Sequence, residues 1–86
     1  MAIVRLRGQL EKLAGGGSEH DIDGETVTEL LVTLEGRFSA LEGWILDERG
    51  SVRSHINVFV NGELATPDSP VAGGDKIEIL PAISGG

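Results

Sequence analysis

The amino-acid sequence predicts an α+β fold, a roll in which one mixed sheet packs on one main helix. Both ends of the chain alternate apolar and polar residues, as half-buried strands do. A capped amphipathic helix lies in the first half, and an Asn-Gly pair in the second half indicates a hairpin. The resulting order is strand, strand, helix, short helical piece, strand, return strand and strand, which is typical of an α+β roll.

The first strand and its partner are expected in the N-terminal quarter. Residues 2–7 alternate with Val4 and Leu6 on one face, and residues 19–23 would return as a polar edge strand with Ile22 turned inward. The segment that joins them is ambiguous at its start and then becomes a flexible, glycine-rich turn.

The main helix has the clearest local signal. Thr26 to Glu29 match a capping box, in which the Thr26 hydroxyl accepts from the Glu29 amide and the Glu29 carboxylate accepts from the Thr26 amide. One apolar stripe follows at helical spacing and should pack on the sheet: Val27, Leu30, Leu31, Leu34 and Phe38. The polar residues expected in solvent are Glu25, Thr28, Glu29, Thr33 and Glu35.

A second, shorter helical stretch is expected after the main helix. It would cover residues 40–46 and bury Leu41, Ile45 and Trp44, before a charged surface loop at residues 47–51.

Two further strands are predicted in the second half. Residues 55–60 alternate, with Ile56, Val58 and Val60 on one face and Phe59 on the other, and Asn61-Gly62 should reverse the chain into residues 63–64.

The last strand is expected at residues 76–80, with Ile77 and Ile79 inward. Pro81 lacks an amide hydrogen and should end the ladder pairing. We therefore divide the chain into a domain of residues 1–80 and a flexible tail of residues 81–86.

Composition excludes several classes of function. The chain has 86 residues and no cysteine, so disulfides, thiolate metal sites and cysteine nucleophiles are excluded. A formal net charge of −7 argues against nucleic acid binding, and it suits either a basic protein partner or solubility alone. His20 and His55 have no ligand set around them, so no metal site is expected. No apolar stretch approaches the roughly 20 residues of a membrane span, and no signal peptide is visible, so a cytoplasmic protein without membrane contact is expected.

Three segments together carry a family resemblance: residues 24–31, residues 56–63, and residues 74–86 with their final Ser84-Gly85-Gly86. In these segments the chain resembles the ubiquitin-like sulfur carriers of the MoaD/ThiS superfamily, and the resemblance covers most of its length. It implies the β-grasp (ubiquitin-like) fold, which agrees with the element order above.

The resemblance also implies a chemistry at Gly86. An ATP-dependent activating enzyme of the MoeB/ThiF kind adenylates the terminal glycine carboxylate, and sulfur then displaces AMP to leave a thiocarboxylate. A biosynthetic enzyme accepts that sulfur. The carrier is then a protein cosubstrate and not an enzyme, and it binds no cofactor itself because ATP is used by its partner. Gly85 and Gly86 have no side chains, so they can pass a narrow channel to the nucleotide site.

A docking surface is implied as well, because related carriers dock through an apolar patch on the sheet face together with the tail. The residues expected to contact the partner are Phe59, Leu80, Pro81, Ala82, Ile83 and Ser84. An alternative stays open, in which Phe59 and Leu80 complete a small second core under the Trp44 segment.

The resemblance also bears on the pathway that the carrier would serve. The tail and the long segment before Ile56 look more like carriers for cysteine or molybdopterin synthesis than thiamin-type carriers, and we lean toward the cysteine type. The alternatives are the small subunit of molybdopterin synthase, a protein modifier conjugated to lysine through Gly86, and a plain interaction module with an irrelevant tail.

Overall fold

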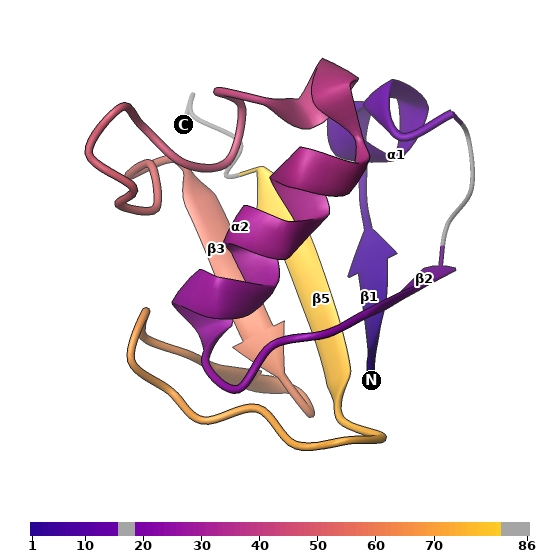
Figure 1. The fold of residues 1–86 in the computed structure, drawn as a ribbon, viewed down its shortest axis with the longest axis vertical. Helices are drawn as coiled ribbons and strands as arrows, with labels where there is room; N and C mark the ends of the chain where they lie inside the picture. The colour runs from indigo at the N-terminus through magenta and orange to yellow at the C-terminus, as the bar shows by residue number, and fades with distance from the viewer. Residues whose placement is uncertain (16–18, 82–86) are drawn as a thin grey trace.

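The computed structural model describes residues 1–15 and 19–81, which form a five-stranded mixed sheet with one main helix on it. Its elements are β1 (Ala2–Leu6), α1 (Gln9–Leu13), β2 (Glu19–Ile22), α2 (Val27–Arg37), a 3₁₀ turn (Ser39–Leu41), β3 (Ile56–Val60), β4 (Glu63–Leu64) and β5 (Lys76–Pro81). The strand order is β2-β1-β5-β3-β4, with β1 parallel to β5 and the other pairs antiparallel. Figure 1 shows α2 lying across one face of this sheet, so the predicted roll is confirmed.

The core lies between α2 and the inner face of the sheet. The apolar stripe predicted for the helix is buried as expected, except that Phe38 is only partly buried. The inward residues of the strands meet this stripe: Ala2, Val4, Leu6, Ile22, Ile56, Val58, Ile77 and Ile79. The alternation in the sequence therefore predicted the inward face of these strands correctly, and Val60, also predicted inward, is partly buried and packs on the core.

The ambiguous segment after β1 is a short helix. Gly8 adopts a positive φ of 60°, and α1 follows it with Leu10 fully buried. The glycine-rich turn predicted beyond this helix lies partly outside the described residues.

One of the two hydrogen bonds predicted for the capping box at the start of α2 is present, and the other is wrong. The Thr26 hydroxyl accepts from the Glu29 amide at 3.2 Å, as expected. The Glu29 carboxylate instead accepts from the amide of Glu25, at 3.3 Å. The chain approaches α2 in an extended conformation, since Thr26 forms an isolated antiparallel bridge with Pro70, and this brings the Glu25 amide to the carboxylate.

The segment after α2 differs from the predicted helix over residues 40–46. Only the 3₁₀ turn is helical there, and Trp44 is 41% exposed although burial was expected. The cause is Glu35, which was expected in solvent but is partly buried. Its Oε2 atom accepts from the amides of Ile45 and Leu46 at 3.0 and 2.9 Å, and these contacts replace helical bonds. Ile45 is buried as predicted.

The hairpin turn between β3 and β4 is confirmed. Asn61 and Gly62 have φ angles of 51° and 86°, the left-handed pair that a two-residue turn requires. The Asn61 side chain also fastens the turn to the start of β5, because it donates to Asp75 at 3.1 Å and accepts from the Lys76 amide at 2.9 Å.

Pro81 does not end the ladder, contrary to the prediction, since it pairs with Ile56 of β3. The carbonyl of Ile79 accepts from Arg7, so the odd-numbered residues of β5 direct their backbone groups toward β1. The missing amide hydrogen of Pro81 therefore faces the side where β1 has already ended, and the pairing with β3 loses nothing.

Candidate functional site

The tail continues from the centre of the sheet. β5 lies between β1 and β3, and Figure 1 shows its end at the same side of the sheet as the start of β3. Leu80 and Pro81 are partly buried and are held by register pairing with Asn57 and Ile56. The other predicted tail residues lie outside the described residues: Ala82, Ile83, Ser84, Gly85 and Gly86.

The length of this tail limits where chemistry at Gly86 can occur. Five residues follow Pro81, and five fully extended residues span at most about 18 Å. Any group that reacts with Gly86 must therefore come within about 18 Å of the end of β5. A protein that supplies such a group would lie against this end of the sheet.

Phe59 and Leu80 lie on the outer face of the sheet, which α2 does not cover. They alternate with the inward residues Val58 and Ile79, and Phe59 pairs across the hairpin with Leu64. Phe59 and Leu80 are partly buried, whereas Leu64 is 67% exposed. Leu64 is the direct cross-strand neighbour of Phe59, and Leu80 lies diagonally from Phe59, one pair nearer the end of β5 on the same face. We call these three side chains the outer patch.

The alternative role of Phe59 and Leu80 as a second core has no support in the packing. Among the described residues, the partly buried side chains that pack on the core include Phe38 and Val60 but neither Phe59 nor Leu80. The Trp44 segment instead packs with α2, through the bonds that Glu35 accepts.

Ion pairs cover the other half of the outer face. Arg5 contacts Glu19 at 2.7 Å, and Arg7 contacts Glu78 at 3.1 Å. Such exposed pairs contribute only about 0–1 kcal/mol each, so they mainly keep this part of the sheet polar. This half of the face is therefore mainly polar, with Ile3 of β1 as a partly buried apolar residue among the ion pairs.

The described residues contain no arrangement typical of a catalytic or metal site. No polar or charged side chain among residues 1–15 and 19–81 is fully buried, and within these ranges no three His, Cys, Asp or Glu side chains are grouped as metal ligands. Bonds from the Ser51 and Arg49 amides lower the pKa of Asp47, and bonds from the Ala72 amide and Asn61 lower that of Asp75. Both carboxylates fix turns. None of the helices in the described parts of the chain combines the length and apolar character of a bilayer span.

Comparison with known protein families identifies the family of this chain. The model of the ThiS family matches residues 4–86, nearly the whole chain. The chain belongs to the ThiS family. Members of this family are small ubiquitin-like sulfur carriers and modifiers, which act as cosubstrates of enzymes.

The relatives of this chain include a protein modifier and a sulfur carrier. The chain is 37% identical to small archaeal modifier protein 1 of Haloferax volcanii, over 95% of this chain and 97% of the relative. It is 31% identical to the sulfur carrier protein CysO of Mycobacterium tuberculosis, over 84% of each.

Solved structures agree with the fold. The crystal structure of the Haloferax volcanii protein superimposes with a TM-score of 0.84 at 36% identity, covering 99% of this chain and 98% of that one. CysO in the Amycolatopsis orientalis BexX/CysO complex superimposes with a TM-score of 0.87 at 29% identity, covering 100% of both chains. The β-grasp fold expected from the resemblance is therefore confirmed.

Proposed function

We propose that this protein is a sulfur carrier that reacts through the carboxylate of Gly86. An ATP-dependent adenylating enzyme of the MoeB/ThiF kind would activate that carboxylate, and a biosynthetic enzyme would accept the sulfur. The observation that carries the proposal is the ThiS family match, which includes the Gly85-Gly86 pair.

The proposed reaction has two steps. A carboxylate oxygen of Gly86 attacks the α-phosphorus of ATP, and pyrophosphate leaves. Hydrosulfide then attacks the acyl carbon, AMP leaves, and loss of the hydrosulfide proton gives the Gly86 thiocarboxylate. The described residues include no buried acid, base or metal ligand set for these steps, which is consistent with an enzyme that brings all of them.

Docking on that enzyme is assigned to the outer patch and the tail. Leu80 and Pro81 form the end of β5, and Phe59 pairs with Glu78, three residues before that end, so a partner bound there would lie within reach of Gly86. Ala82, Ile83 and Ser84 would thread between the patch and the nucleotide site, and Gly85 and Gly86 would enter it because they carry no side chains.

Extension of the chain tests the reactive end. One alanine added after Gly86 should abolish ATP–pyrophosphate exchange by the adenylating enzyme, while the melting temperature stays the same. Equal exchange by the extended and the original chain would contradict the proposal, because it would show that the Gly86 carboxylate is not the reacting group.

Conjugation to lysine is the second candidate, and the 37% identity to an archaeal modifier protein favours it. The CysO relative favours sulfur transfer, and with it the cysteine pathway, over the small subunit of a molybdopterin synthase. Both fates share the adenylated Gly86 and differ in the acceptor. Lysines of other proteins that carry residues 77–86 of this chain, the remnant that trypsin leaves after it cleaves at Lys76, would establish conjugation when mass spectrometry finds them in cells that make the carrier. Their absence, together with a thiocarboxylate at Gly86, would leave sulfur transfer.

A further inference from the structure

A groove of about 280 Å³ opens along the outer edge of β3. It exists because β4 has only two residues. After Leu64 the chain keeps one backbone bond to β3, from the Ala65 amide to the Val58 carbonyl at 2.8 Å. It then leaves the sheet toward α2, where the Pro67 carbonyl accepts from the Thr28 amide at 3.1 Å.

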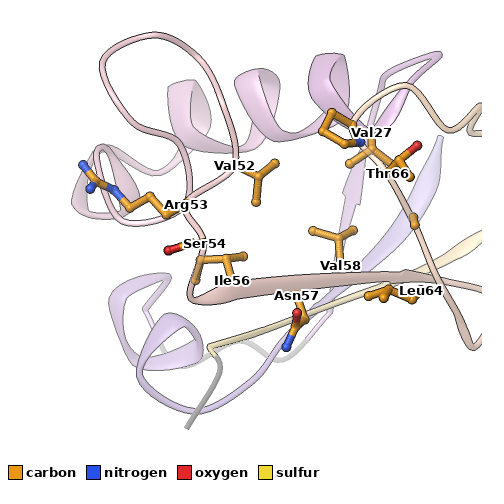
Figure 2. Close-up of a pocket in the computed structure, with 11 residues that line it drawn as sticks. Val27, Val52, Arg53, Ser54, Ile56, Asn57, Val58, Leu64 and Thr66 are labelled. Atoms are coloured by element: carbon orange, nitrogen blue, oxygen red, sulfur yellow. The ribbon is translucent and has the colours of Figure 1, made fainter. Parts of the chain in front are cut away.

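The groove has an apolar interior and a polar rim. In Figure 2, Val52 and Val58 face each other across the hollow, and Val27 closes it beneath the start of α2. Arg53 and Thr66 lie toward its ends. A cavity of about 150 Å³ can hold a benzene molecule, so this groove has room for a large apolar side chain. An apolar centre inside a polar rim is the usual anatomy of a protein interface.

The groove is continuous with the proposed docking surface. Ile56 lines it and pairs with Pro81, where the tail begins. Leu64 also lines it and pairs with Phe59 of the outer patch. An enzyme that reaches Gly86 comes within about 18 Å of Pro81, and Ile56, the partner of Pro81, is the part of the groove nearest to it.

We propose that the adenylating enzyme inserts an apolar side chain into this groove while it binds the outer patch, so that it holds β3 from both sides. The inference rests on the proposed function. The Arg53 guanidinium points away from the hollow in Figure 2, where its Nε atom donates to the Gly43 carbonyl at 2.6 Å, so it places a positive charge just beyond one end of the groove in a chain of net charge −7. The inserted side chain should therefore have an acidic neighbour in the enzyme's sequence.

Two variants test the groove in ATP–pyrophosphate exchange with the ThiF-like enzyme of the same organism. Leu64→Asp places a charge at the exposed rim, and Thr66→Phe fills the groove without touching the outer patch. Each should raise the KM for the carrier about tenfold and leave kcat unchanged, as expected for the loss of one interface anchor. Val32→Asp is the matched control, because Val32 is 54% exposed on α2 and does not line the groove. Its KM should stay within about twofold of the original.

The outcomes separate the two proposals. No exchange with the unchanged carrier would overturn the proposed function, and this inference with it. Exchange with a normal KM for Thr66→Phe would overturn the inference alone, whatever Leu64→Asp does, because Leu64 also belongs to the outer patch. Melting temperatures show whether each variant is folded. If Thr66→Phe is misfolded, Ser54→Phe decides in its place, because Ser54 is exposed, lines the other end of the groove and lies outside the outer patch.

Discussion

Glu35 shows most clearly how one residue shapes the surface of this protein. Its position on the polar side of the helical pattern predicted exposure, yet its carboxylate accepts from the amides of Ile45 and Leu46. No local pattern could reveal this role, because the partners lie ten and eleven residues further along the chain and meet Glu35 only after the loop has folded back.

Glu35→Ala should therefore destabilise the fold by about 2 kcal/mol, since it leaves two amides in a partly buried place without their acceptor. Glu35→Gln keeps an acceptor oxygen and should cost less. Urea unfolding of both variants measures the difference. Equal stability of Glu35→Ala and the original protein would show that the loop is held by other contacts.

Phe59 tests whether the outer patch is a binding surface. Phe59→Ala should abolish or strongly weaken activation by the adenylating enzyme and leave the melting temperature nearly unchanged, because Phe59 does not pack on the core. Phe38→Ala is the matched control: Phe38 is also partly buried but packs on the core, so its loss should lower the melting temperature. An equal fall in the melting temperature of both variants would assign Phe59 to the core instead.

At the scale of the elements, alanine substitution of two glycines near α2 should change the stability of the fold in opposite directions. A Cβ atom at Gly24 would lie 2.6 Å from the backbone nitrogen of Leu30, whereas one at Gly36 would meet nothing within 4 Å. Gly24→Ala should therefore destabilise the fold by about 2 kcal/mol or more through overpacking, while Gly36→Ala should stabilise it by up to about 1 kcal/mol. Thermal unfolding of the two variants provides the check, and a shift in the same direction for both would contradict the packing at Gly24.

The hydrogen bond between Asn61 of the β3–β4 turn and Asp75, just before β5, predicts that the stability of the fold depends on pH. Bonds from the Ala72 amide and Asn61 lower the pKa of Asp75 in the folded protein. The ionised carboxylate therefore stabilises the fold at pH values above the pKa that Asp75 has in the unfolded chain. That contribution is lost as the pH falls below about 3.9 and through the lower folded pKa. Asp75→Asn should thus be less stable than the original protein at neutral pH, and the difference should shrink in acid.

Urea unfolding at several pH values measures this difference, with Asp68→Asn, in an exposed loop, as the control. A stability difference for Asp75→Asn that stayed constant as the pH fell would contradict the ionic role of Asp75.

The elements that could be predicted from the sequence are those defined by nearby residues. The alternation of β1, β3 and β5, the Thr26 cap and the Asn61-Gly62 turn are local signals, and each is present. The failures concern distant partners. Residues 40–46 do not form the predicted helix, because the Glu35 carboxylate accepts from an amide of this segment. Pro81 continues the pairing with β3, because its missing amide hydrogen faces the side where β1 has already ended.

At the scale of the whole molecule, the fold is a helix packed on a sheet whose central strand, β5, leads into the tail. The sequence could predict the roll and the family, because the three segments that carry the resemblance also form α2, the hairpin and β5. The sequence could not reveal the groove beside β3, since it depends on how early the chain leaves β4 and turns toward α2.

The central claim is that sulfur is carried at Gly86, and tandem mass spectrometry of the C-terminal peptide tests it most directly. The carrier is incubated with ATP, a sulfur source and an extract of its own organism, and the fragment ions locate any exchange of oxygen for sulfur. Intact mass would not suffice, because that exchange nearly equals the oxidation of Met1. We predict sulfur at Gly86. An unchanged Gly86, in an extract whose adenylating enzyme is shown to be active on another substrate, would contradict the claim.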